Sequence, residues 1–203
     1  MSGCLPLLAD WPAGSRCPSL PRKDRTVELY EHASVLFQIS TVHEGGIAVL
    51  VYAIGFSLSA LIYFVVTTLF ELPPLNNVRS ATPRERGMEV AVNAPLMSAP
   101  VVLVILAGTL QIPSLAVVGG VIELLIALAG LSLWWLPYLI GTSVPWATGP
   151  GETWEELHAR TYAQTLIILP LKGDRPRPNL EHMILHALLV TGSILAFAYA
   201  LSL

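Results

Sequence analysis

Long apolar segments alternate with short polar ones along most of this chain. Residues 45–70 and 90–112 contain no Asp, Glu, Lys or Arg, residues 114–141 contain only Glu123, and residues 183–203 contain none. A bilayer core about 30 Å thick is crossed by roughly 20 apolar helical residues, and each segment reaches that length. The pattern therefore predicts an all-α integral membrane protein. Its four transmembrane helices are expected at about 45–70, 90–112, 114–141 and 180–203.

Prolines mark the ends of the predicted spans. Pro73 and Pro74 follow the first span, and Pro113 separates the second span from the third; proline lacks the amide that would continue a helix. The turn at Pro113 is so short that the second and third spans must be antiparallel neighbours. A 38-residue loop, 142–179, precedes the last span, and the spacing of its apolar residues predicts a helix over 152–168.

Residues 1–44 form an N-terminal region before the membrane domain of residues 45–203. Four prolines within the first 23 residues predict an irregular tail. The segment 25–43 is only partly apolar at helical spacing, so we expect either a helix at the membrane interface or a direct lead-in to the first span. Cys4 and Cys17 both lie in the tail, and whether they pair is left open.

The basic residues predict an orientation in the membrane. The positive-inside rule counts Lys and Arg in short loops, within about 15–20 residues of a span. The side with loops 73–89 and 142–179 holds Arg79, Arg84, Arg86, Arg160, Lys172, Arg175 and Arg177. The side of the two termini holds Arg16, Arg22, Lys23 and Arg25, nearly all too far from a span to count. We therefore expect a protein of the plasma (inner) membrane, with both loops in the cytoplasm and both termini outside.

The composition fits a membrane location and gives no sign of nucleic acid as a partner. Hydrophobic residues make up 54% and charged residues only 12% of the 203 positions, whereas soluble domains carry about 25% charged residues. The sequence has no basic stripe of the kind that binds nucleic acid. The expected partner is the lipid bilayer, and a protein partner or a homo-oligomer is left open.

Two histidines stand one helical turn apart at the start of the last span. Pro178 precedes Asn179, a strong N-cap residue, so a helix is expected to begin there and to carry His182 and His186 on one face. Two imidazoles at this spacing can bind one transition-metal ion such as zinc. The simpler alternative is that each ring hydrogen-bonds to a loop or a lipid headgroup. A proton-linked role is the third alternative.

A metal site would need further ligands from the same side of the membrane. His158 belongs to the long cytoplasmic loop, and we expect the loop to fold back so that His158 or a carboxylate comes near His182. The carboxylates on that side are Glu71, Glu89, Glu152, Glu155 and Glu156.

Glu123 lies near the middle of the third span, about 13 Å deep at 1.5 Å per residue. An ionised carboxylate there costs about 2.5–3.5 kcal/mol on insertion scales. We therefore expect Glu123 to face the bundle and to contact a polar group, with Ser98 and Thr109 of the second span as candidates. It is either a functional group or a hydrogen bond that joins helices. Gly119-Gly120 would let another helix approach closely.

Three aromatic residues lie near the end of the third span. Trp134, Trp135 and Tyr138 are spaced in a way typical of the aromatic belt that anchors a membrane protein at the headgroup level. We therefore predict that they anchor this end of the span.

From Trp134 onward the chain resembles a group of small uncharacterised bacterial multi-pass membrane proteins. The resemblance rests on WWLPY at the end of the third span, on Thr161-Tyr162 and Leu169-Pro170 in the long loop, and on PNLEHMILH at the start of the last span. It covers about a third of the chain and implies no activity. It does imply that Pro178-Asn179 and the two histidines form one unit.

Two kinds of function fit these observations. The sequence contains no nucleophile elbow, Walker motif or dinucleotide glycine pattern, so we favour a non-enzymatic protein that packs with a partner or helps to move a small solute. The alternative is a metal-binding membrane enzyme or metal-handling protein that uses His182, His186 and His158 at the cytoplasmic face. The metal content of the purified protein would separate the two.

Overall fold

The computed structural model describes residues 25–145, 148, 151–162 and 164–203, with side chains from residue 45 onward. The predicted irregular tail and both cysteines lie outside the described residues. The chain divides into two compact units, Met1–Thr41 and Val42–Leu203. In the first unit the described residues are helical.

Four helices are long and apolar enough to cross a membrane. They are the Gly45–Leu69 part of α1 (Arg25–Leu69), α2 (Pro83–Leu110), α3 (Pro113–Leu139) and α5 (Leu180–Ser202). The described residues contain no strand, so the fold is all-α and has the architecture of a multi-pass membrane protein. Helix α1 has the bounds Arg25–Leu69, and whether its first part lies at the membrane interface stays a prediction.

Helix α2 begins seven residues before the predicted start at residue 90, because its first two turns are polar. Thr82 is its N-cap: the side chain accepts a hydrogen bond from the Glu85 amide, and the Glu85 carboxylate accepts one from the Thr82 amide. This reciprocal capping box satisfies two amide donors at the helix end. Pro83 at the first helical position reinforces the start. An apolar stretch alone therefore underestimates the length of this helix.

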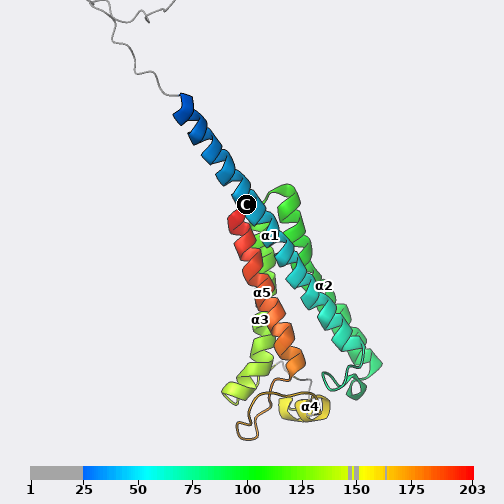
Figure 1. Cartoon of the computed structure of the whole chain (residues 1–203). Helices are drawn as coiled ribbons and strands as arrows, with labels where there is room; N and C mark the ends of the chain where they lie inside the picture. The colour runs from blue at the N-terminus through cyan, green and yellow to red at the C-terminus, as the bar shows by residue number, and fades with distance from the viewer. Residues whose placement is uncertain (1–24, 146–147, 149–150, 163) are drawn as a thin grey trace, which may run out of the picture. The chain divides into compact units, whose positions relative to one another are not determined.

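Helices α2 and α3 are antiparallel neighbours, as the short turn between them predicts (Figure 1). Gln111 caps α2 in the left-handed region, with φ of 56°, and Pro113 starts α3. We call the end of the membrane domain at this turn the turn end. The opposite end, where residues 70–82 and 140–179 connect the helices, is called the loop end.

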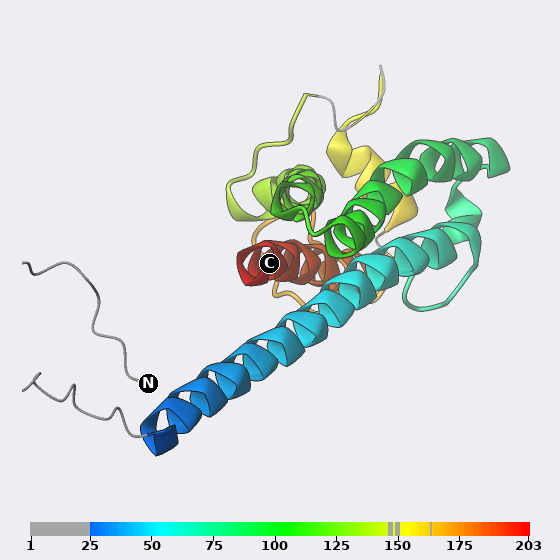
Figure 2. The same ribbon diagram turned by 90° about the horizontal axis from the view of Figure 1, so that it is seen from above.

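Small residues bring the helices together in the half near the turn end. A carbon added at Gly119 would lie 3.3 Å from the Pro100 carbonyl oxygen of α2, and one at Gly120 would lie 3.2 Å from the Phe197 ring of α5. Close approach at glycine is how membrane helices gain packing contacts. The prediction for Gly119-Gly120 is therefore confirmed, and α3 packs against both α2 and α5 (Figure 2).

Large apolar side chains point outward along all four spans. Val51, Val92, Leu125 and Ile194 are each about 60% exposed. Side chains of this kind are stable in contact with lipid, and such a surface would be far too apolar for water. The four-helix bundle therefore has small residues at its close helix contacts and apolar side chains on its outer surface.

Helix α4 (Trp154–Thr161) crosses the loop end of the bundle (Figure 1). Thr153 and Glu156 form a second capping box at its start. The predicted helix over 152–168 is too long, because the chain leaves the helix after Thr161. The Leu166 amide then donates to the Pro74 carbonyl at 2.7 Å, and the Leu166 carbonyl accepts from the Leu180 amide at 2.8 Å. These two hydrogen bonds hold the segment around Leu166 between the α1–α2 connection and the start of α5.

Candidate functional site

A cavity of about 540 Å³ lies at the loop end, between the four spans and α4. Its walls come from α1, α2, α3 and α5, and α4 covers it. The volume lies within the usual range for small-molecule sites. Three of the four predicted site residues lie in this region. His182 and His186 line the cavity, and His158 lies beside it.

Asn179 organises the start of α5. It is fully buried, and its Oδ1 accepts hydrogen bonds from the His182 amide at 3.2 Å and from His182 Nδ1 at 2.7 Å. Its Nδ2 donates to Thr165 Oγ1 at 3.1 Å and to the Glu181 carboxylate at 3.4 Å. The predicted N-cap is confirmed, and the same side chain also holds a histidine ring in place.

The hydrogen bond from Asn179 fixes the tautomer of His182. Because an amide oxygen can only accept, His182 Nδ1 must carry the proton. In the neutral ring Nε2 is then an acceptor. Within the described part of the chain Nε2 makes no hydrogen bond to another protein group. His182 therefore presents an unused acceptor from the cavity wall.

His186 has the opposite tautomer. The Trp135 indole Nε1, which can only donate, lies 3.3 Å from His186 Nδ1. The neutral ring therefore carries its proton on Nε2. That atom lies where a side chain at Gly130 would be, 2.6 Å from an added carbon. Gly130 is thus required for the position of the ring, and the two histidine rings, with centroids 6.3 Å apart, expose one acceptor and one donor.

Trp134 is the centre of an aromatic cluster beneath α4. Its ring lies 3.7 Å from that of His182, 4.7 Å from Tyr162 and 5.1 Å from Trp154, measured between centroids. Trp134 is only 4% exposed. Tyr138 is also buried, and its hydroxyl donates to the Pro170 carbonyl at 3.2 Å.

The prediction of an aromatic belt is therefore wrong for Trp134 and Tyr138, and Trp135 is half-buried and bonded to His186. The sequence did contain a signal for the burial of Trp134. Glu123, Ala127, Gly130 and Trp134 follow the spacing of one helix face, which is the face that α3 turns toward α5. Helical periodicity should have outweighed the position near the end of the span.

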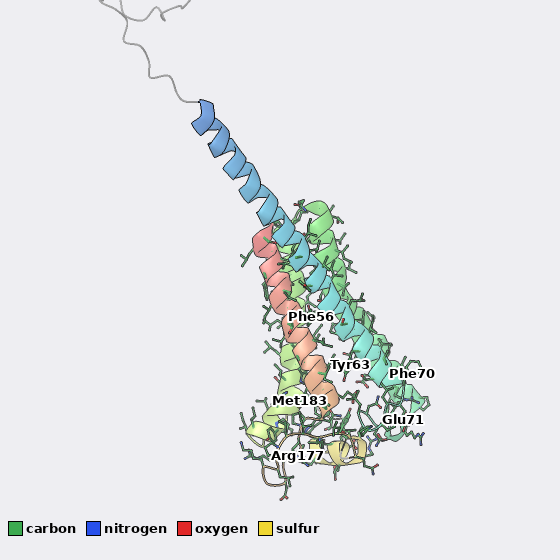
Figure 3. The ribbon with its side chains drawn as sticks, viewed as in Figure 1. Phe56, Tyr63, Phe70, Glu71, Arg177 and Met183 are labelled. Carbon is green, nitrogen blue, oxygen red and sulfur yellow. The ribbon has the colours of Figure 1, made fainter. Side chains whose placement is uncertain are left out.

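His158 joins the same cluster from α4. Its ring lies 6.0 Å from that of Trp134, and its Nε2 donates to the Arg177 carbonyl at 2.8 Å. Figure 3 shows Arg177 beside α4. Burial lowers the pKa of His158, which holds the ring neutral. The long loop thus folds back over the histidine pair as expected, with Trp134 in contact with both His158 and His182.

The carboxylates predicted as further metal ligands are mostly engaged elsewhere. Glu71 pairs with Arg79, Glu152 pairs with Arg160 at 3.1 Å, Glu156 caps α4, and Glu155 is exposed. Glu89 alone among these candidates lines the cavity. Across the described ranges, no group of three His, Cys, Asp or Glu side chains is placed to hold a metal ion.

Three residues of the cavity lining each have a buried polar atom that lacks a hydrogen-bond partner among the described residues. These atoms are Arg86 Nε, Trp154 Nε1 and Thr161 Oγ1. Trp154 is 3% exposed and Thr161 is 9% exposed. A buried polar group without a partner costs about 1–3 kcal/mol, so a site that retains three such groups is suited to a ligand. Sequence inspection missed all three, because an absent partner leaves no local pattern.

The deeper part of the cavity is mostly apolar, with Asn93 and His186 as its polar residues. Phe64, Met97, Ile126, Leu185 and Leu189 line it, and Phe64, Met97 and Leu189 belong to one buried hydrophobic cluster between the spans. The cavity therefore has a polar end beneath α4 and an apolar end within the bundle.

Glu123 lies apart from this cavity, nearer the middle of the bundle. It is 1% exposed, and its carboxylate accepts a hydrogen bond from Ser57 Oγ of α1 at 2.8 Å. The predicted inward orientation is confirmed, but the predicted partners are wrong. Ser98 and Thr109 bond to backbone carbonyls of their own helix. Whether Glu123 has a functional role stays a prediction.

No family model, curated protein or solved structure matches the chain. The four apolar helices have the architecture of a multi-pass membrane protein, and a cavity of about 540 Å³ with polar residues in its lining lies at the loop end of their bundle.

Proposed function

We propose that this protein is a non-enzymatic membrane protein that binds a small amphiphilic solute in the cavity and helps to move it. The observation that carries the proposal is that three residues of the cavity lining each keep a buried polar atom without a partner in the described residues, Arg86 Nε, Trp154 Nε1 and Thr161 Oγ1. A polar head would satisfy those atoms, and an apolar chain would lie between the spans.

The position of the cavity supports a solute that arrives from the bilayer. Its apolar end lies within the spans, while α4 and the residues around it form the polar end. An amphiphile in a membrane has the same order, with its head at the interface and its chain in the core. A solute could therefore enter without turning over.

We further propose that the loop end faces the cytoplasm and that both termini lie outside the plasma (inner) membrane, following the distribution of basic residues. Reporter fusions test this orientation. A reporter that works only in the cytoplasm should be active when inserted near Arg84 and inactive when fused after Leu203. The reverse result would overturn the orientation but leave the cavity unchanged.

The binding proposal is tested by thermal unfolding of the detergent-purified protein with added oleoyl compounds. A ligand that binds only the folded state adds about 2.7 kcal/mol to the free energy of unfolding at 100 times its Kd, so the unfolding temperature rises with ligand concentration. We expect a saturable increase with at least one of monooleoylglycerol, oleate and methyl oleate.

Two matched variants locate the effect. Ala129 lines the cavity on α3, and Ala91 is an exposed alanine of α2 outside the lining. Ala129→Phe should abolish the ligand-dependent increase by filling the cavity, whereas Ala91→Phe should keep it. The proposal fails if no compound stabilises the protein, or if Ala129→Phe responds as the unaltered chain does.

A further inference from the structure

We infer that the head of the solute is an uncharged group with at least two hydroxyls, as in a monoacylglycerol. This inference rests on the proposed function and names the ligand class for the same cavity. It follows from the combination of hydrogen-bond donors and acceptors at the polar end.

The donors come from three elements. Trp154 Nε1 of α4 and Arg86 Nε of α2 are buried donors without a partner in the described residues, and Thr161 Oγ1 can donate or accept. On α5, the bond from Trp135 leaves the proton of the neutral His186 ring on Nε2. A ligand must therefore offer several acceptor oxygens.

The acceptors require a ligand that also donates. The bond to Asn179 leaves His182 Nε2 as a lone pair on the cavity wall. Glu89, one turn along α2 from Arg86, also lines the cavity. A carboxylate or an ester head accepts hydrogen bonds but donates none, so it would leave both acceptors unsatisfied. A hydroxyl group donates one hydrogen bond and accepts two.

The charges at the polar end favour an uncharged head. Arg86 shares the cavity lining with Glu89, three residues further along α2, and Arg160 is paired with Glu152. Glu85 is held in the capping box of α2, and the Glu181 carboxylate accepts from Asn179. Because acidic side chains in the lining outnumber basic ones, an anionic head would gain little from Arg86 and would meet repulsion from Glu89.

The size of the cavity favours one chain over two. About 540 Å³ corresponds to a drug-sized ligand, and Phe64, Met97 and Leu189 of the lining belong to one buried hydrophobic cluster. A two-chain phospholipid would have to leave one chain outside.

The experiment compares heads on one chain. Binding of monooleoylglycerol, methyl oleate and oleate to the purified full chain is measured from their concentration-dependent effect on the unfolding temperature. We expect monooleoylglycerol to bind about tenfold more tightly than either of the others, which corresponds to roughly one hydrogen bond with a buried partner. Equal or tighter binding of oleate or methyl oleate would overturn the hydroxyl head while leaving an amphiphile site in place. If none of the three binds, the proposed function itself fails.

Two variants test the contacts directly. Thr161→Val keeps the shape of the side chain and removes the hydroxyl, and Trp154→Phe removes the indole donor. Each should weaken monooleoylglycerol binding about fivefold to tenfold. Thr109→Val is the control, because Thr109 is an exposed threonine of α2 near the turn end. If both cavity variants fold and bind monooleoylglycerol as the control does, the assigned contacts are wrong.

Discussion

The ring of His182 lies against the ring of Trp134, with 3.7 Å between the ring centroids and 30° between their planes. This contact joins α5 to α3 beneath α4, and Tyr162 and Trp154 pack against the same indole. A side chain expected to lie at the headgroup layer is instead the central buried residue of the loop end.

Replacement of Trp134 should therefore be costly. We expect Trp134→Ala to lower the free energy of unfolding by about 3–5 kcal/mol, as for other buried tryptophans, because four aromatic rings lose a shared partner. Leu128→Ala on the same helix is the control, since Leu128 is 47% exposed. Thermal unfolding in detergent measures both. An aromatic anchor at the membrane surface would instead give a loss no larger than that of Leu128→Ala.

Asn179 offers a second test, because one buried side chain both caps α5 and holds His182. Asn179→Ala should cost about 2 kcal/mol or more: the cap alone accounts for roughly 0.5–2 kcal/mol, and Thr165 and His182 lose their hydrogen bonds as well. Asn77→Ala is the matched control, since Asn77 precedes the short helix η1 (Val78–Ser80) without a capping bond from its side chain. Similar unfolding temperatures for the two variants would show that the Asn179 network contributes little.

Sequence predicted the membrane architecture well but the site only in part. The length of an apolar segment is a local property, so the four spans follow from it. The histidine pair and its cap are also local, because Asn179, His182 and His186 lie within one short stretch of helix. The boundaries of α2 and α4 depended on capping boxes and on distant backbone bonds such as Leu166 to Pro74.

The cavity could not be predicted, because its walls come from five helices that are far apart in sequence. Arg86, Trp154 and Thr161 stand out only when their surroundings are known. The partner of Glu123 was missed for a related reason. The short turn between α2 and α3 favoured partners on α2, whereas Ser57, which donates to the Glu123 carboxylate, is on α1.

Acid should weaken the loop end through His158. Burial lowers the pKa of this ring in the folded protein, so the folded state favours the neutral form. Above the unfolded pKa of about 6.5 the His158 ring is neutral in both states, and its contribution to the free energy of unfolding is fully present. As the pH falls below that value, the unfolded chain gains a proton that the folded chain does not, and stability decreases until the folded pKa is passed.

The comparison of the unaltered chain with His158→Gln isolates this effect. Glutamine can still donate to the Arg177 carbonyl but does not titrate. Between pH 7.5 and 5.5 the unfolding temperature should fall less for His158→Gln than for the unaltered chain, measured in the same detergent. Equal decreases would mean that His158 is not the titrating group.

Glu123 and Gly192 fit each other so closely that the two positions should be coupled. A carbon added at Gly192 would collide with the Glu123 carboxylate. Gly192→Ala should therefore destabilise the protein by about 1–3 kcal/mol, despite the gain of roughly 1 kcal/mol that alanine brings within a helix. Gly55→Ala is the control, because nothing lies within 4 Å of the added carbon there, and it should be neutral or stabilising.

The double variant decides whether the carboxylate causes the loss. In a Glu123→Ala background the space opposite Gly192 is empty, so Gly192→Ala should lower the free energy of unfolding little or even raise it. The effects of the two substitutions should then differ from additive by a coupling energy of at least 1 kcal/mol. Glu123→Gln should fold and keep the hydrogen bond from Ser57, because the amide oxygen can accept it as the carboxylate does. Additive effects of Glu123→Ala and Gly192→Ala would contradict the close packing of α3 against α5 at this level of the bundle.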